Sequence, residues 1–288
     1  MNYKLLSGGG LLVAAILFLT FQTAFAQDQR AQILAAEAVR LEKAGRFAEA
    51  VSVYLKILET DPPKSASIYN NLGADYFELG EYDRAVEALQ RSVALRSDDE
   101  KAFYNLGVVY ARLGRNDEAE TALQKAVGLN PNYAEPRAKL CDLYLNWERA
   151  EEAAGCYRKL LPSVPDDAQS HSNYGVALMR SGRWEESVRV LEKTLRAFPP
   201  NAETLNNLGV ALLELRRFKE AIAAFERALG FEPDHNAVRY NLAIAQLARK
   251  NESAAIEQYS FLKRADPDLA ELLFRKIFRK KVISVKER

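Results

Sequence analysis

Residues 66–99 have the sequence ASIYNNLGADYFELGEYDRAVEALQRSVALRSDD, and residues 100–133 follow with the same pattern as EKAFYNLGVVYARLGRNDEAETALQKAVGLNPNY. Aligned without a gap, the two stretches place Gly107 34 residues after Gly73 and Ala119 34 residues after Ala85. A fixed period of this size indicates stacked copies of one small unit and not a single closed core. Such stacks bind along a surface and seldom carry chemistry, which bounds the function.

The same period continues through most of the chain. The glycine returns as Gly175 and Gly209, whereas Cys141 and Ala243 take its place in two other copies. A closing proline also recurs, as Pro131, Pro165, Pro199, Pro233 and Pro267. Because proline cannot continue a helix, each of these positions is expected to end one unit before the next begins.

Each copy is predicted to be two helices joined by a tight turn. In residues 66–99 the first helix is expected over about 66–79 and the second over about 83–95, with apolar residues three or four apart on one face of each. A glycine inside a helix costs about 1 kcal/mol relative to alanine, so the return of Gly73 suggests a place where two helices approach closely. Glycines in the turns should adopt the left-handed conformation; they are Gly45, Gly80, Gly114 and Gly182.

This pattern of an aromatic residue, Leu-Gly, Tyr, and later Ala, an aromatic and Pro resembles the tetratricopeptide repeat family. We count seven units, at residues 31–65, 66–99, 100–133, 134–167, 168–201, 202–235 and 236–269. The fourth and seventh depart from the pattern, because Arg137 and Arg239 replace the aromatic residue. The resemblance implies an all-α, right-handed α-solenoid in which the first helices line a concave groove.

Residues 1–26 have the anatomy of a secretory signal peptide. Lys4 is their only charge, an apolar run follows over residues 11–21, and residues 24–26, Ala-Phe-Ala, form a small-x-small cleavage pattern. Cleavage after Ala26 would export the chain to the periplasm or the medium; an uncleaved membrane anchor is the alternative. Loss of Lys4 takes the formal net charge from +1 to about zero, so no global charge favours nucleic acid or a membrane. We expect a solenoid over 27–269 and no separate domain.

The two cysteines lie in the same predicted unit. Cys141 falls midway along its first helix and Cys156 midway along its second, so both sit at a similar height in an antiparallel pair. In an exported protein they could form a disulfide. Alternatively they are two small buried thiols, since packed helices often hold Cα atoms too far apart for a bridge.

The sequence offers no candidate catalytic site, metal site or cofactor site. His171 and His235 fall in different units, and neither belongs to a cluster with metal-ligand spacing. The single glycines lie at structural positions, so none forms a phosphate-binding loop, and no Gly-x-Ser-x-Gly motif is present. We therefore predict a protein that is not an enzyme.

The candidate site is a ladder of polar residues two positions before the repeated glycine. Asparagine is a mediocre helix former, so its recurrence there needs a reason. An Asn amide can donate and accept at once, which suits the backbone of an extended peptide. The ladder resembles that of the O-linked N-acetylglucosamine transferase superhelix, although nothing of that enzyme's catalytic domain is present. Alternatively, each Asn bonds a neighbouring unit or caps a turn. The ladder residues are Asn71, Asn105, Lys139, Asn173, Asn207 and Asn241, flanked by Asn70, Tyr104, Asn206 and Tyr240.

The end of the chain departs from the repeats. Residues 269–278 are predicted to form an amphipathic helix that caps the last unit, within a segment 270–288 that ends in a basic tail. Such a tail could sit on anionic lipid or simply fray in solvent. Two functions follow: a non-catalytic scaffold that holds a peptide or protein segment in its concave groove outside the cytoplasm, or an assembly subunit of an envelope complex docking through its convex face or basic end. The expected partner is a protein or peptide and not nucleic acid; the sequence leaves the oligomeric state open.

Overall fold

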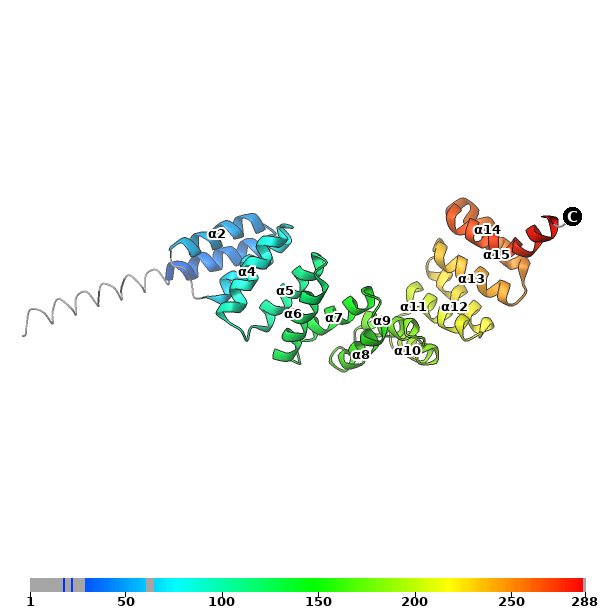
Figure 1. The fold of residues 1–288 in the computed structure, drawn as a ribbon, viewed down its shortest axis with the longest axis horizontal. Helices are drawn as coiled ribbons and strands as arrows, with labels where there is room; N and C mark the ends of the chain where they lie inside the picture. The colour runs from blue at the N-terminus through cyan, green and yellow to red at the C-terminus, as the bar shows by residue number, and fades with distance from the viewer. Residues whose placement is uncertain (1–17, 19–21, 23–28, 61–64, 287–288) are drawn as a thin grey trace, which may run out of the picture. The chain divides into compact units, whose positions relative to one another are not determined.

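The computed structural model describes residues 18, 22, 29–60 and 65–286, and every regular element among them is helical (Figure 1). The predicted leader, residues 1–26, lies outside the described residues apart from Phe18 and Gln22. The chain divides into two compact parts, Met1–Pro136 and Arg137–Arg288, which we call the N-terminal half and the C-terminal half. The all-α solenoid predicted from the sequence is confirmed.

The N-terminal half is built from successive antiparallel helix pairs. A helix over residues 29–43 pairs with α2 (Phe47–Thr60), and α3 (Ala66–Glu78) pairs with α4 (Tyr82–Leu95). A third pair is formed by α5 (Glu100–Arg112) and α6 (Asn116–Leu129). We refer to the earlier member of each pair as the first helix and to the later one as the second helix.

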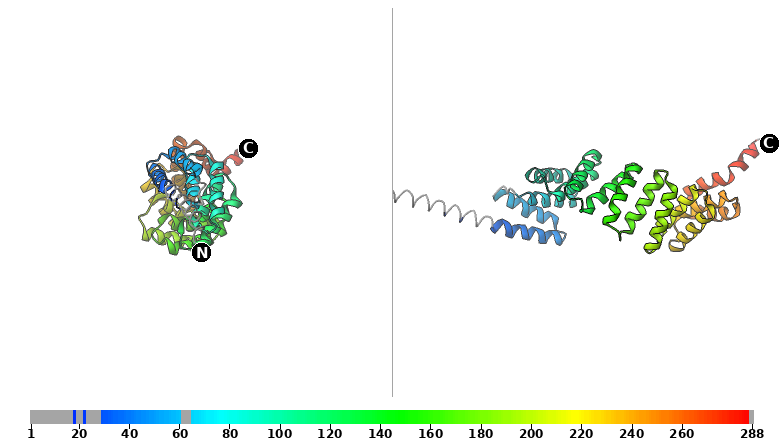
Figure 2. Two further views of the ribbon diagram at one scale, coloured as in Figure 1. Left: turned by 90° about the vertical axis from the view of Figure 1, so that its left-hand side faces the viewer. Right: turned by 90° about the horizontal axis from the view of Figure 1, so that it is seen from below.

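The C-terminal half continues the same construction. Its helices are α7 (Ala134–Asn146, which begins just before the boundary), α8 (Ala150–Leu160), a short 3-10 turn η1 (Leu161–Ser163), α9 (Ala168–Arg180), α10 (Trp184–Ala197), α11 (Ala202–Glu214), α12 (Phe218–Phe231), α13 (Asn236–Ala248), α14 (Glu252–Ala265) and α15 (Pro267–Lys286). The second view of Figure 2 shows these helices in successive side-by-side rows, with the end of α15 extending past the last pair.

The repeated glycines lie where the two helices of a pair touch. A Cβ added to Gly73 would stand 2.5 Å from Leu89 Cγ and 3.2 Å from the Ala85 carbonyl oxygen. The corresponding distance from Gly107 to Leu123 Cγ is 2.7 Å, and from Gly209 to Phe225 Cε1 it is 2.5 Å. No real Cβ tolerates such contacts. The glycine therefore makes room for one large side chain of the second helix, as well as for a close backbone approach.

The turns between paired helices need a left-handed residue. Four are glycines with φ between 71° and 76°: Gly45, Gly80, Gly114 and Gly182. In three other pairs the same conformation falls on Glu148, Arg216 and Lys250, with φ of 59°, 59° and 62°. Because a Cβ is crowded at positive φ, these three turns carry backbone strain that the glycine turns avoid.

The fourth repeat replaces the glycine contact with a covalent one. Cys141 of α7 and Cys156 of α8 form a disulfide, with their Cα atoms 5.3 Å apart. Cys141 is fully buried, and the large residue opposite it is Tyr157, which is also fully buried.

Helix α15 covers the apolar end of the last pair. Ala270, Leu273 and Ile277 are buried in a cluster with Ala255 and Leu262. The buried face of α15 does not include Leu272, which is 50% exposed. The helix also runs on to Lys286, so Arg279, Lys280, Lys281 and Lys286, which were predicted to lie in a tail, belong to its last turns.

Candidate peptide-binding surface

In the N-terminal half, two ladder asparagines reach across from one repeat to the previous one. Asn71 donates from Nδ2 to the hydroxyl of Tyr54 at 3.0 Å, and that hydroxyl donates to Glu42 Oε1 at 2.6 Å. Asn105 donates from Nδ2 to Asn70 Oδ1 at 2.9 Å. Both asparagines thus connect neighbouring repeats through their amide nitrogens.

The C-terminal half contains the same kind of Asn–Asn pair and a related tyrosine network, in which the asparagine donates to the acid and not to the tyrosine hydroxyl. Asn173 donates to Asp142 Oδ1 at 3.2 Å, and the Tyr157 hydroxyl donates to the same oxygen. Asn241 donates to Asn206 Oδ1 at 3.0 Å. A tyrosine network and an Asn–Asn pair therefore each occur once in either half.

The partner of a ladder asparagine depends on the residue 35 positions earlier. Asparagine stands there for Asn105 and Asn241, and the two amides bond directly. Ser172 occupies that position for Asn207, but it accepts from Thr204 Oγ1 at 3.2 Å. In the described part of the chain Asn207 consequently makes no side-chain hydrogen bond.

Two adjoining hollows open on the first-helix side of the N-terminal half. The first, of about 240 Å³, is lined by Glu42, Phe47, Asn71, Ala74, Asp75 and Glu78, and we call it the acidic hollow. The second, of about 220 Å³, is lined by Ala74, Phe77, Glu78, Leu89, Tyr104, Asn105, Val108 and Val109, and we call it the apolar hollow. The two share Ala74 and Glu78, and each contains one ladder asparagine. The ladder in this half thus follows a continuous pair of hollows.

The acidic hollow contains a carboxyl group without a partner. Asp75 is only 2% exposed, and its Oδ2 has no hydrogen bond. Burial, together with the neighbouring charges of Glu42 and Glu78, raises the pKa of Asp75 from 3.8 to about 7. Glu42 differs from it, because its Oε1 is held by the Tyr54 hydroxyl.

The two flanking tyrosines of the predicted site are partly buried. Burial raises the pKa of Tyr104, with a smaller contribution from Glu135, and its ring lies 5.7 Å from the ring of Tyr133 in an edge-to-face arrangement. Tyr240 packs against the apolar cluster under α15, and burial raises its pKa as well. Lys139, in the fourth repeat, is partly exposed.

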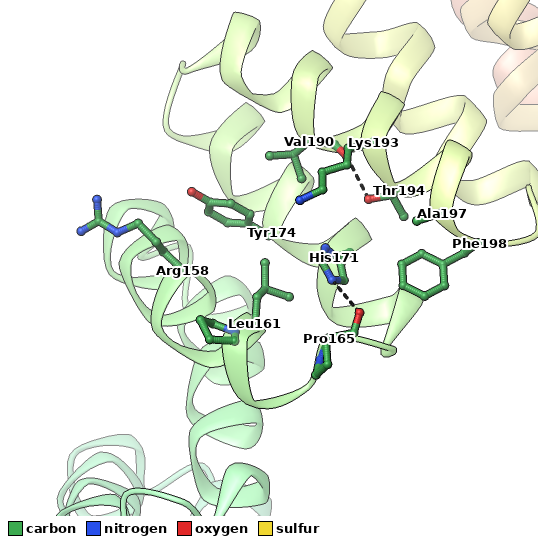
Figure 3. A pocket seen from close by; sticks show the side chains of 11 residues that line it. Arg158, Leu161, Pro165, His171, Tyr174, Val190, Lys193, Thr194, Ala197 and Phe198 are labelled. Atoms are coloured by element: carbon green, nitrogen blue, oxygen red, sulfur yellow. Dashed lines mark hydrogen bonds between the residues drawn. The ribbon is translucent and has the colours of Figure 1, made fainter.

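A larger pocket, of about 440 Å³, lies in the C-terminal half between α8, η1, α9 and α10 (Figure 3). Its walls include Leu161, Val190 and Phe198, together with the exposed cations Arg158 and Lys193. His171 Nε2 lies 3.2 Å from the carbonyl oxygen of Pro165, and its ring lies 5.4 Å from that of Phe198. The pocket involves none of the ladder residues, so it is separate from the predicted site.

Sequence reasoning missed the tyrosine networks. Their signal was available, because tyrosine replaces the Leu or Phe opposite the glycine in the repeats that lack the glycine. The residues are Tyr54 with Ala38, Tyr157 with Cys141 and Tyr259 with Ala243. In the first two of these repeats the hydroxyl bonds an acid on the first helix.

Residues 18, 22, 29–60 and 65–286, which the structure describes, hold neither a cluster of metal ligands nor a membrane-spanning helix. No group of three or more His, Cys, Asp or Glu side chains is arranged to hold a metal ion. No helix in these ranges is both long enough and apolar enough to span a bilayer.

Solved structures share this fold. The C-terminal part of a tetratricopeptide repeat-containing protein from Cytophaga hutchinsonii superimposes with a TM-score of 0.69 at 18% identity, covering 81% of this chain and 95% of that one. YrrB, described as a tetratricopeptide repeat protein with an unusual peptide-binding site, gives 0.59 at 20% identity, covering 68% and 97%. The MamA protein gives 0.54 at 27% identity, covering 58% and 91%.

Family models agree with these structures. No curated protein sequence matches the chain significantly. The model described as the cilia and flagella-associated protein 70 C-terminal domain matches residues 11–241, and the model described as tetratricopeptide repeat matches residues 212–273. The chain therefore belongs to the tetratricopeptide repeat family, and most of it matches the form of repeat found in that C-terminal domain.

Proposed function

We propose that this protein is an exported, non-catalytic scaffold that binds an extended peptide or protein segment along its first helices. Tetratricopeptide repeats are generally non-catalytic and bind proteins, and the repeats of this chain have that fold. The observation that carries the proposal is the pair of adjoining hollows in the N-terminal half, each with a ladder asparagine in its wall.

The hydrogen bonds of the ladder suit this role. Asn105 uses Nδ2 to reach Asn70, and its Oδ1 has no partner among the described residues. A free carbonyl beside a hollow can accept from a backbone N–H of a bound segment, while the hollow receives a side chain. The bond to Asn70 also fixes the orientation of the Asn105 amide, which lowers the entropy lost on binding. The peptide-binding site described for YrrB, which shares the fold, is consistent with such a use.

Photo-crosslinking tests the location. Purified protein beginning at Gln27 would select dodecapeptides from a phage-displayed library, and a selected peptide would then be offered to two variants. One carries the photoreactive p-benzoylphenylalanine at Tyr104, in the apolar hollow; the matched control carries it at Lys125, an exposed residue of the second helix α6. We expect crosslinks from position 104 and not from position 125. Equal crosslinking from both positions, or crosslinking from position 125 alone, would show that the peptide does not bind at the proposed surface.

Export is part of the proposal because of the leader-like residues 1–26 and the disulfide. Structural disulfides persist in oxidising compartments and are rare in the cytosol. N-terminal sequencing of the protein recovered from its host tests this point: the proposal expects Gln27 as the first residue, and an intact Met1 in the cytosolic fraction contradicts it.

A second candidate function is docking through α15. Leu272 is 50% exposed, and the exposed cations Arg275 and Lys276 follow it by three and four residues, so the three side chains share one side of the helix. An apolar and basic face of this kind suits an anionic membrane surface. Co-sedimentation with vesicles containing phosphatidylglycerol, before and after Leu272→Ser, would show whether the face binds lipid; unchanged sedimentation would exclude it.

A further inference from the structure

Two acids of the acidic hollow, Asp75 and Glu42, stand at positions where the following repeats carry apolar residues. The residues equivalent to Asp75 in the five following repeats are Val109, Leu143, Ala177, Ala211 and Ala245, all of them buried. Those equivalent to Glu42 in the six following repeats are Phe77, Ala111, Leu145, Met179, Leu213 and Leu247. The fold therefore does not require a carboxyl group at either position, and burying one costs free energy.

The hollow also lacks a cation of its own. Among the described residues, no Lys, Arg or His forms an ion pair with Glu42, Asp75 or Glu78. The ion pairs of this half join other groups, such as Arg46 with Glu49 and Arg84 with Glu81. Buried polar groups are nearly always satisfied, so the orphaned Oδ2 of Asp75 points to a donor that arrives from outside.

The remaining contacts hold the hollow ready for such a donor. The Tyr54 hydroxyl, itself bonded by Asn71, fixes Glu42 Oε1 at one side. The three carboxyl groups do not form a group arranged to hold a metal ion. An organic cation with several N–H donors suits this site better than a metal ion does, because the site has carboxyl acceptors and few donors. The apolar hollow adjoins it, since Ala74 and Glu78 line both hollows.

We propose that the acidic hollow receives the basic side chain, arginine or lysine, of a bound segment, with an apolar side chain of the same segment in the apolar hollow. This inference rests on the proposed peptide-binding function and specifies its partner. The cation supplies the hydrogen bond that Asp75 lacks, and its positive charge offsets one of the negative charges of Glu42 and Glu78. It thereby offsets the cost of replacing an apolar residue by aspartate.

The test compares peptide selections. The immobilised protein from Gln27 onward, and its Asp75→Asn and Glu87→Gln variants, would each select from the same phage-displayed dodecapeptide library. Glu87 is an exposed acid of the second helix α4, so its variant removes one negative charge from the same half without touching the hollow. Thermal melts would confirm that each variant is folded; asparagine preserves the size of Asp75.

We expect Arg or Lys next to an apolar residue in the peptides selected by the wild-type protein and by Glu87→Gln, and loss of the basic preference in Asp75→Asn. A selected peptide, made synthetically, should bind Asp75→Asn at least about tenfold more weakly, since hydrogen bonds between charged groups contribute about 1.5–3 kcal/mol. Peptides selected without a basic residue, or a basic preference that survives Asp75→Asn, would overturn this inference and leave the scaffold function standing. Failure to select any peptide would overturn both.

Discussion

Asn105 donates its side-chain amide to Asn70 Oδ1 at 2.9 Å, so a residue of the predicted ligand ladder also joins two repeats of the N-terminal half. The same relationship links Asn241 to Asn206 in the C-terminal half. Asn207 has no side-chain partner among the described residues. Substituting it should therefore affect binding of a peptide without changing the stability of the fold.

The first prediction uses this difference. Asn105→Ala leaves the half-buried Asn70 carbonyl without its donor and should lower the free energy of unfolding by about 1 kcal/mol. Asn207→Ala should change it by less than about 0.5 kcal/mol, as for an ordinary surface position. Urea unfolding followed by circular dichroism measures both. Equal losses would show that the Asn105–Asn70 bond contributes nothing specific.

The second prediction concerns the glycine contacts. Gly107→Ala would push its Cβ to 2.7 Å from Leu123 Cγ, so it should lower the free energy of unfolding by about 1–3 kcal/mol through overpacking. Gly128→Ala is the matched control in the same helix pair, because nothing lies within 4 Å of a Cβ built there. The control should be neutral or stabilise by up to about 1 kcal/mol, since alanine is the better helix former. A destabilised control would show that the helices, and not the contact, govern the result.

Much of the fold could be predicted because the same steric contact is repeated from one repeat to the next. A contact such as Gly73 with Leu89 recurs in each regular repeat, and so its residues recur in the sequence at a constant interval. The left-handed turn at Gly80 also recurs at this interval, and its glycine recurs with it in several of the repeats. The sequence does not, however, state how deeply a charged residue lies. In the helical pattern of its repeat, Asp75 looks like an exposed surface acid. Only the equivalent residues of later repeats, such as Val109, Ala177 and Ala211, indicate that the position is buried.

The candidate site could be predicted only in part. The ladder positions recur and are visible in the sequence, but the partner of each amide depends on which residue the neighbouring repeat brings within reach. Asn70 meets Asn105, whereas Ser172 bonds Thr204 and leaves Asn207 alone. The hollows also could not be predicted, because their volume depends on side chains from three helices packed together in space.

The third prediction concerns the strained turns. Arg216 has a φ of 59° at a position where other repeats have glycine, and its side chain is exposed. Arg216→Gly should raise the free energy of unfolding by about 0.5–1 kcal/mol, because glycine adopts this conformation without a Cβ clash. Arg227→Gly, in the interior of α12 where φ is helical, is the opposite control and should destabilise by about 1 kcal/mol. A stability loss at both positions would show that the turn is not strained.

The fourth prediction is a dependence of stability on pH through Asp75. Its pKa is about 7 in the folded protein and 3.8 without the fold, so the folded state binds the proton more tightly. Stability should therefore be greatest below about pH 4 with respect to this group and fall as pH rises toward 7, then level off above it. The groups that face it are Glu42 from the helix over residues 29–43 and Glu78 on α3, with Tyr54 on α2 bonded to Glu42.

Thermal melts at pH 5, 6, 7 and 8 test this dependence against Asp75→Asn, which cannot ionise. The wild-type melting temperature should fall relative to the variant across this range. A constant difference between the two proteins at all four pH values would mean that Asp75 titrates normally in the fold.

The fifth prediction concerns the bridge between Cys141 and Cys156, which closes a loop of 15 residues within the fourth repeat. By restricting the unfolded chain, a loop of this size should contribute about 3 kcal/mol to stability. Reductant should accordingly lower the melting temperature of the wild-type protein and leave that of the Cys141→Ser, Cys156→Ser double variant unchanged. Intact mass after alkylation verifies that the bridge has opened. An unchanged wild-type melt after verified reduction would mean that the buried packing of Cys141 and Tyr157 holds this repeat without the bridge.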